Sequence, residues 1–214
     1  MSGHCCPSEN ANANDPVFRK VLWFALIVNA GMFFIEITAS ELSDSLALKA
    51  DALDFFGDSA NYAISLFVVA SSLTVRARAS IFKALTMLAF AAFVLLSAIH
   101  KAANGSVPVA QTMGAIGFLA LLANVAVAFA LFKFRTGDSN MQSVWLCSRN
   151  DAIGNLAVIA AAGGVFATYS RWPDLIVAVI MASLALTSAV KIFGLARAEL
   201  REEHLRNQVS SHKH

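Results

Sequence analysis

Charge and cysteine are both scarce in this sequence. Asp, Glu, Lys and Arg make up 14% of its 214 residues, against about 25% in an ordinary soluble domain. A disordered chain needs many charges and few apolar side chains, so disorder is excluded for most of the sequence. Three cysteines in a chain of this length are too few to staple a secreted disulfide scaffold.

Several functional signatures are also missing. The net charge is only +2, which is too small for a nucleic-acid-binding surface. The sequence contains no G-x-S-x-G, no H-E-x-x-H and no phosphate-binding loop, so neither a hydrolase nor an ATP-driven pump is indicated. We therefore expect no enzyme. The first fifteen residues lack a cationic start and an apolar run, so we expect a polar tail there and no signal peptide.

Apolar residues, by contrast, are abundant and occur in long runs. They form 57% of the chain and raise its mean hydropathy to +0.64. A helix needs about 20 residues to cross a hydrocarbon core of about 30 Å. Six runs approach or exceed that length: residues 21–40, 45–73, 81–100, 107–132, 143–168 and 175–193. None alternates with the period of a strand, so we predict an all-α, six-helix polytopic transmembrane bundle.

Short connections separate the six runs, at residues 41–44, 74–80, 101–108, 133–140 and 169–174. None could form a second domain, so we expect a polar tail over 1–16, a membrane domain over 17–197 and a charged tail over 198–214. Among the Lys and Arg residues of the connections and tails, only Lys101 and Arg171 fall on the side opposite the N-terminus. Because Lys and Arg are retained on the cytoplasmic side, we expect both termini in the cytoplasm.

Acidic residues interrupt the apolar runs at five positions: Glu36, Asp51, Asp54, Asp58 and Asp151. A charge inside a membrane is costly, so such residues face the bundle interior and mark a functional site by default. Asp51, Asp54 and Asp58 are spaced i, i+3, i+7, which places them on one face of one helix. On another helix, Cys147 lies four residues before Asp151.

Asn155 lies one turn beyond Asp151 and extends the polar face of the fifth run. Two helices that each offer two anionic or soft ligands can together form a four-ligand tetrahedral site, which Zn²⁺ prefers. Each ligand must lose its proton to bind, so metal and protons compete, as metal/proton antiport requires. Alternatively, the acids pair with Lys49 and Arg149 in a structural ion network, or relay protons without a metal.

Two segments resemble signatures of the cation diffusion facilitator family. Residues 45–58, SLALKADALDFFGD, resemble its second helix, in which an S-L-A-L-x-A-D-A run leads into two metal ligands separated by three residues. Residues 147–155, CSRNDAIGN, are similar to its fifth-helix pattern H/D-x3-D-A-x-G. Supporting positions are Asn29, Glu36, Asn124, Pro173 and Asp174. The resemblance covers about residues 17–195.

The resemblance implies a transport site made of Asp54, Asp58, Cys147 and Asp151, with Asp51 and Asn155 as auxiliary residues. It implies export of a divalent transition metal, with Zn²⁺ favoured over Cd²⁺ or Co²⁺, in exchange for protons. The expected setting is the inner membrane of a bacterium, and the expected partners are metal ions, protons, lipid and a second copy of the chain. No resident cofactor and no nucleic acid are implied.

The sequence departs from the family pattern in two ways. Cys147 stands where the family normally has His or Asp, and a thiolate favours softer ions such as Zn²⁺ and Cd²⁺. Arg149 is an unusual neighbour whose cation would weaken metal binding if it pointed into the site. Most members also carry a cytoplasmic domain after the sixth helix, which has no counterpart here. We therefore expect any dimer contact to come from the membrane helices or the short tail.

Two further hypotheses concern the N-terminus and the function. His4, Cys5 and Cys6 offer ligands for soft ions, but we favour an ordinary polar tail with free thiols. The rival function is a non-transporting membrane metal sensor or partner protein with the same fold, favoured by Cys147 and the missing domain. Flux separates the two functions, because a sensor binds metal without moving it.

Overall fold

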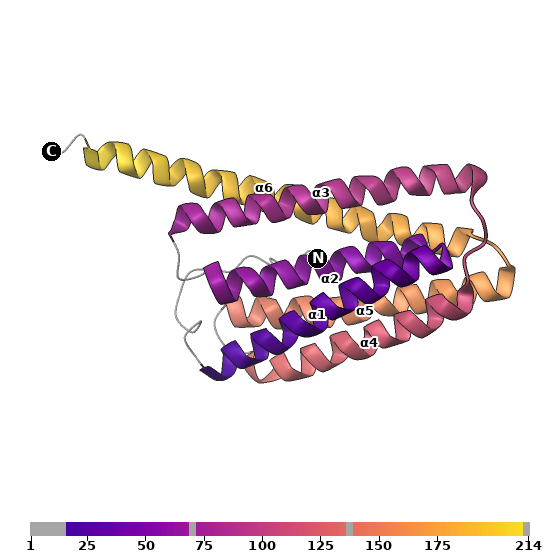
Figure 1. Cartoon of the computed structure of the whole chain (residues 1–214). Coiled ribbons are helices and arrows are strands. Elements are labelled where there is room, and N and C mark those ends of the chain that lie inside the picture. Colours follow the sequence, from indigo (N-terminus) through magenta and orange to yellow (C-terminus); the bar gives the residue numbers. More distant parts are fainter. Residues whose placement is uncertain (1–15, 69–71, 136–138, 212–214) are drawn as a thin grey trace.

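The computed structural model describes residues 16–68, 72–135 and 139–211, and within these ranges it contains helices and no strands. The long helices are α1 (Pro16–Ser43), α2 (Leu46–Ala63), α3 (Leu73–Asn104), α4 (Ala110–Leu131), α5 (Ser139–Thr168) and α6 (Trp172–Ser211). Figure 1 shows that they run side by side along one direction of the molecule. The predicted six-helix bundle is therefore confirmed.

Five of these helices, all except α2, are long and apolar enough to cross a membrane. Large apolar side chains on them face outward, and Phe34 on α1 and Phe129 on α4 are 66% and 81% exposed. Water disfavours an apolar surface of this extent, whereas lipid chains accommodate it. The chain is thus an integral membrane protein with several membrane-crossing helices.

Helix α2 differs from the others in composition. Its 18 residues include Lys49, Asp51, Asp54 and Asp58, which are too many charges for a helix surrounded by lipid. The position of α2 explains how the membrane protein accommodates these charges, because α2 contacts each of the other five long helices. The bundle therefore shields these charges from lipid, and the charge-bearing part of the run at 45–73 forms α2 among the other five helices.

The start of α2 is fixed by a carboxylate from the far end of the chain. Asp174, in the first turn of α6, accepts hydrogen bonds from Ser45 Oγ at 2.6 Å and from the backbone N–H groups of Leu46 and Ala47, both at 2.9 Å. Ser45 Oγ in turn accepts from the N–H of Leu48 at 3.2 Å. A carboxylate at a helix N-terminus stabilises the helix. These bonds set the depth at which the three aspartates of α2 lie.

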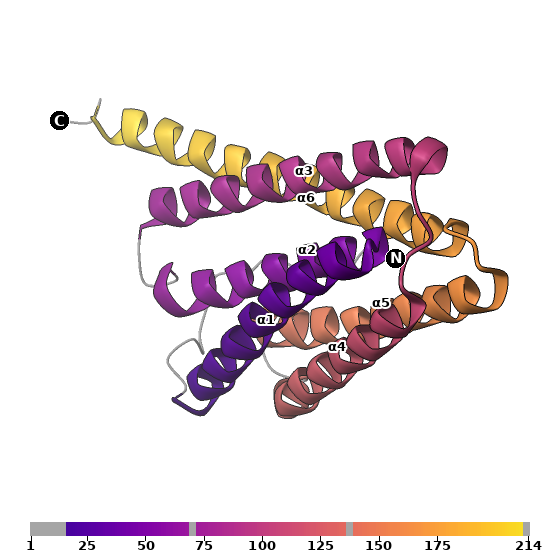
Figure 2. The same cartoon turned by 45° about the vertical axis from the view of Figure 1, so that its right-hand side comes forward.

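The helices are arranged in three neighbouring pairs. The most extensive contacts join α3 to α6, α4 to α5 and α1 to α2, and Figures 1 and 2 show α1 and α2 between the other two pairs. Small residues allow close approach: a Cβ on Gly117 of α4 would lie 3.2 Å from Val158 Cγ1 on α5. Such contacts are typical of helix packing in membranes.

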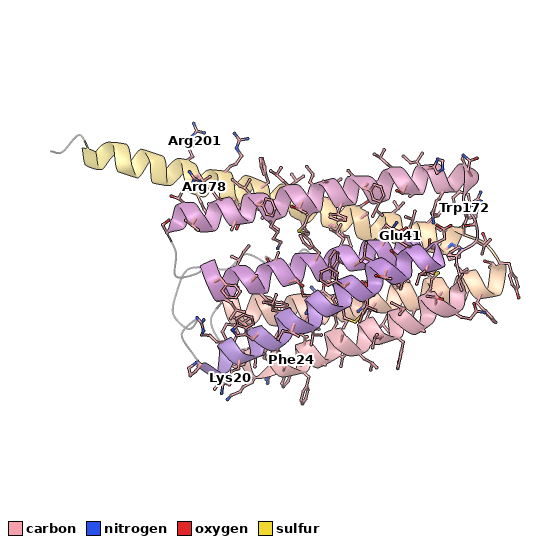
Figure 3. The ribbon with its side chains drawn as sticks, in the orientation of Figure 1. Lys20, Phe24, Glu41, Arg78, Trp172 and Arg201 are labelled. Atoms are coloured by element: carbon pink, nitrogen blue, oxygen red, sulfur yellow. The ribbon has the colours of Figure 1, made fainter. Side chains whose placement is uncertain are left out.

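The two ends of the bundle differ in charge. We call the end at which α1 begins the inner end and the opposite end the outer end. Figure 3 shows Lys20, Arg78 and Arg201 at the inner end, and Glu41 and Trp172 at the outer end. The cations expected on one side of the membrane therefore lie at the same end of the molecule.

Two predicted boundaries are wrong. The connection expected at 74–80 is helical, because α3 already begins at Leu73. Its sequence TVRARAS contains no Gly or Pro, and Arg and Ala favour helices even outside a membrane. The run at 45–73 is not one helix, since α2 ends at Ala63 and a π-helical turn, Ile64–Val68, follows. The charged tail expected from residue 198 continues α6 as a helix as far as Ser211.

Candidate metal site

Carboxyl groups from α2 and α5 meet in the interior of the bundle. The carboxyl groups of Asp58 on α2 and Asp151 on α5 lie within hydrogen-bonding reach of each other. Asp54, one turn outward on α2, interacts electrostatically with Asp58 and Asp151. Three of the four predicted ligands therefore face one another, from two helices that are far apart in the sequence.

A tyrosine and a serine support this acid cluster from its inner side. Tyr62, 2% exposed, donates a hydrogen bond from Oη to Asp58 Oδ2 at 3.1 Å and lies 2.9 Å from Ser148 Oγ on α5. The side chains of Asp58, Tyr62 and Ser148 thus link α2 to α5 on the inner side of the acid cluster. Neither Tyr62 nor Ser148 was predicted from the sequence, although Tyr62 follows Asp58 by one helical turn.

The fourth predicted ligand lies outside the side chains that the structure describes. The backbone of Cys147 belongs to α5, one turn before Asp151, but only the backbone is described at this position. His4, Cys5 and Cys6 also lie outside the described residues. Among the side chains that are described, no three from His, Cys, Asp or Glu are arranged to hold a metal ion. A complete ligand set thus requires Cys147 or a rearrangement of the acids.

A second pair of acids lies further toward the outer end. Glu36 on α1 and Asp51 on α2 are 0% and 2% exposed, and their carboxyl groups interact electrostatically with each other. Asp51 is seven residues from Asp58, or about 10 Å along the helix. Asp54 lies between the two pairs and interacts electrostatically with both Glu36 and Asp58. The acids therefore form a continuous column.

Several buried polar atoms on α1, α2, α4 and α5 lack a hydrogen-bond partner: Oε1 and Oε2 of Glu36, Oδ2 of Asp51, Oδ2 of Asp151, Oδ1 of Asn124, and both side-chain polar atoms of Asn155. Burying a polar group without a partner costs roughly 1–3 kcal/mol. Such groups in native proteins call for an ion, water or a proton to complete them. The buried oxygens of the column are therefore left without enough hydrogen-bond donors among the described residues.

The two basic residues of the alternative ion network do not enter the column. Lys49 pairs with Glu41, with 2.6 Å between Lys49 Nζ and Glu41 Oε1, and its ammonium lies 5.6 Å from the ring centre of Phe93. Arg149 is exposed and donates to Asn150 Oδ1 at 3.2 Å. The contacts described for these two cations go to Glu41, Phe93 and Asn150, and they give no support to that network.

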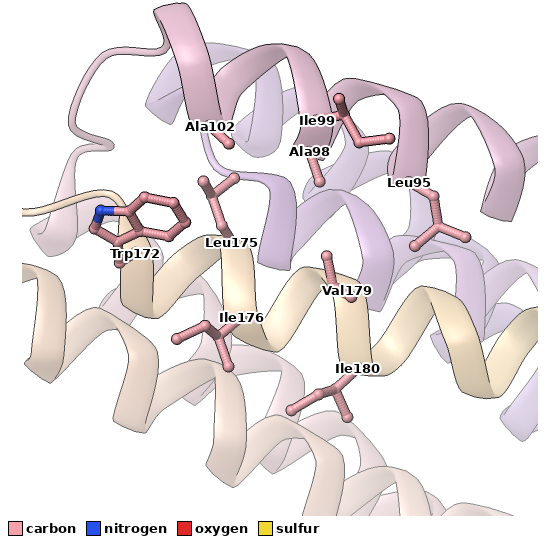
Figure 4. A pocket seen from close by; sticks show the side chains of 9 residues that line it. All are labelled: Leu95, Ala98, Ile99, Ala102, Trp172, Leu175, Ile176, Val179 and Ile180. Atoms are coloured by element: carbon pink, nitrogen blue, oxygen red, sulfur yellow. The ribbon is translucent and has the colours of Figure 1, made fainter.

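A large groove elsewhere has a different character. It lies between the outer halves of α3 and α6 and has a volume of about 610 Å³. Apart from the indole of Trp172, its walls are aliphatic, with Leu95 and Ile99 on α3 and Leu175 and Val179 on α6 (Figure 4). It offers no carboxylate, thiolate or imidazole, so it cannot hold a metal ion.

Comparison with known proteins decides the family. Residues 22–201 match the family model described as the cation efflux transmembrane domain. The chain belongs to the cation efflux family. This confirms the family assignment made from residues 45–58 and 147–155.

Two named relatives are 27% and 28% identical to this chain over the aligned residues. A cadmium, cobalt and zinc/H(+)-K(+) antiporter of Bacillus subtilis is 27% identical over 201 residues, which cover 85% of this chain and 63% of the relative. The zinc transporter ZitB of Pectobacterium atrosepticum is 28% identical over 211 residues, covering 91% and 65% respectively. The chain thus spans just under two thirds of the length of these relatives.

Proposed function

We propose that this protein exports a divalent transition-metal ion from the cytoplasm in exchange for protons. The observation that carries the proposal is the meeting of Asp58 and Asp151 inside the bundle, with Asp54 one turn away. Their charges need a cation or protons in a region that lipid surrounds. Metal and protons compete for such ligands because a carboxylate binds metal only after losing its proton.

The proposed ligands are Asp54, Asp58, Cys147 and Asp151, with Asp51 and Asn155 as auxiliary residues. Three carboxylates with one thiolate make a site of mixed hardness that suits Zn²⁺ and, among softer ions, Cd²⁺. Relatives named for zinc, cadmium and cobalt transport support the same range of ions. Zn²⁺ is the proposed physiological cargo.

The proposed orientation places both termini in the cytoplasm of a bacterial cell, with the inner end of the bundle facing that side. Lys20, Arg78 and Arg201 at the inner end support it, because cationic residues are retained on the cytoplasmic side. In this orientation the column of acids leads outward from Asp58 toward Glu36 and Asp51. The proposed assembly is a homodimer formed through the membrane helices.

Flux measurements in proteoliposomes test the proposal. Protein is reconstituted with a pH-sensitive dye inside the vesicles, and uptake of Zn²⁺, Cd²⁺, Co²⁺ and Mn²⁺ is followed together with the internal pH. We expect uptake of Zn²⁺ and Cd²⁺ coupled to proton movement in the opposite direction. Asp58→Asn should abolish both fluxes, while Glu199→Gln, at an exposed site on α6, should leave them unchanged.

The same assay identifies the alternatives. Metal binding without flux would replace the proposal with a membrane metal sensor or partner protein. Proton flux that does not depend on any of the four metals would indicate a carrier in which the acids serve protons alone.

A further inference from the structure

Lys83 on α3 is a buried cation that the proposed function does not use. The apolar span of α3 begins at Ala77, so Lys83 lies six residues, or about 9 Å, inside it. A lysine this close to a membrane surface ordinarily extends its ammonium group toward water. Here the residue is only 5% exposed.

The side chain of Lys83 turns toward α2 instead. Its Nζ donates a hydrogen bond to Oδ1 of Asn61 on α2. Asn61 lies three residues after Asp58, which places both on one face of the helix. The ammonium group interacts electrostatically with the Asp58 carboxylate. A fixed positive charge therefore stands about one helical turn inward of the proposed metal ligand.

We propose that Lys83 sets the affinity of the metal site by repelling the bound ion from its inner side, an inference that rests on the proposed function. The positive charge of Lys83 would repel a divalent ion bound by Asp58, and the protein interior screens this repulsion far less than water does. A transport site must bind its cargo firmly enough to capture it and weakly enough to release it. Lys83 lowers the affinity of a site that otherwise offers up to four anionic ligands to one ion.

The proposal differs from a purely structural role in the sign of its effect. If Lys83 only joined α3 to α2 through Asn61, removing it would loosen the bundle, and metal binding would weaken or stay the same. If it acts by repulsion, removing its charge makes binding tighter. A tighter site also releases metal more slowly, so maximal turnover falls while the apparent KM decreases.

Binding of Zn²⁺ and of Cd²⁺ to the full chain in nanodiscs provides the first test, by titration calorimetry. We expect Lys83→Met to tighten binding of both ions about tenfold and Lys83→Arg, which keeps the charge, to stay close to the wild type. The matched control is Lys49→Met, because Lys49 is also partly buried on the bundle interior but pairs with Glu41 at the outer end. It should leave the affinity unchanged.

A neutral variant that retains the hydrogen bond to Asn61 separates the effect of the charge from any effect of misfolding. Lys83→Gln can still donate to Asn61 and carries the same expectation as Lys83→Met. In proteoliposomes both neutral variants should show a lower maximal rate and a lower KM for Zn²⁺ than the wild type. Unchanged or weaker binding in both neutral variants would overturn the inference, as would a Lys83→Arg protein that behaves like them.

The site variants separate failure of this inference from failure of the proposed function. If the wild type binds Zn²⁺ and Asp58→Asn and Asp151→Asn abolish binding, the proposed site stands and the Lys83 variants alone decide the inference. A folded wild-type protein that binds none of the tested metals overturns both.

Discussion

Tyr62 and Ser148 hold one carboxylate of the acid cluster from two different helices. The hydrogen bond from Tyr62 Oη limits the orientations open to Asp58, and Ser148 fixes the tyrosine from the α5 side. Groups that orient a ligand in this way typically change metal affinity 10–100-fold when they are removed. The geometry of the proposed metal site would therefore depend on residues outside its ligand set.

Tyr62→Phe tests this dependence. The substitution keeps the buried ring and removes only the hydroxyl, so we expect metal affinity to fall about tenfold with little change in folding. Tyr169→Phe is the matched control, because Tyr169 is 80% exposed in the α5–α6 connection. Zinc titrations of the two variants and the wild type make the comparison. Equal affinities for all three would show that Asp58 needs no such support.

Cys147 separates this sequence from the family pattern, and its role is a prediction from spacing. Cys147→Ser replaces a soft donor with a hard one, so we expect Cd²⁺ uptake to fall more than Zn²⁺ uptake. Cys147→His should retain Zn²⁺ transport and shift the preference away from Cd²⁺, since imidazole still completes a tetrahedral site. An unchanged ratio of Cd²⁺ to Zn²⁺ uptake in Cys147→Ser would remove the thiolate from the ligand set.

At the scale of the helices, polar contacts at the outer end join elements that are distant in sequence. Asp44, in the turn between α1 and α2, accepts hydrogen bonds from Lys101 on α3 and from Ser106. Arg171 donates to the backbone oxygens of Ala102 and Gly105. Together with the bonds of Asp174 to α2, these contacts tie α3 and α6 to the rest of the bundle at that end.

The contact between Asp44 and Lys101 predicts a pH dependence of stability. Partial burial opposes ionisation of Asp44, but hydrogen bonds from Lys101 and Ser106 outweigh it and lower the pKa of Asp44 below its ordinary value. Because the pKa is depressed in the folded state, the stabilisation is present above the ordinary pKa of about 4 and is lost as the pH falls through the lower, folded value. Asp44 is 46% exposed, so the effect is small, about 0.5 kcal/mol.

Asp44→Asn provides the measurement. Asp44 has a φ of 52°, and Asn tolerates this left-handed conformation almost as well as Asp. We expect the variant to melt below the wild type at pH 7 and to approach it only as the pH falls through the lowered pKa of Asp44 in the folded protein. A melting difference that persists unchanged at low pH would place the effect in the backbone turn.

The helices themselves were predictable because lipid imposes a simple rule on composition: each long apolar run contains one of the six long helices, although the run at 45–73 extends beyond the end of α2. The helical structure of residues 74–80 was not predictable. α3 extends beyond its apolar part into a charged segment whose composition is typical of a loop. Spacing along α2 and along α5 pointed to Asp54, Asp58 and Asp151 as candidate ligands. It could not point to Lys83 or Ser148, and Asp174 was named only through the family resemblance, because their roles arise from contacts between helices that sequence spacing does not contain.

For the molecule as a whole, the distribution of cations predicts its direction in the membrane. Val107, 47% exposed, lies in the connection between α3 and α4 at the outer end, and Arg78 lies exposed at the inner end. With Cys5, Cys6 and Cys147 replaced by Ser, Val107→Cys should react with a membrane-impermeant maleimide in intact cells. Arg78→Cys should react only after permeabilisation. The reverse pattern would invert the proposed direction of export.

The central position of α2 also has a consequence for how the chain enters a membrane. Each Asp at the centre of a helix costs about 2.5–3.5 kcal/mol on insertion into lipid, and α2 carries three. When α2 leaves the ribosome, α1 is the only membrane helix already synthesised, and α5 and α6 have not yet been made. We therefore expect a chain truncated after residue 72 to leave α2 at the membrane surface in a glycosylation-mapping assay, and the whole chain to insert it.

Replacing Asp51, Asp54 and Asp58 of the truncated chain by Leu should restore insertion of α2. Equal insertion of α2 from the unaltered truncated chain and from the whole chain would contradict the expectation. If it holds, the acids proposed to bind the transported ion also delay insertion of α2 until the later helices of the bundle have been synthesised.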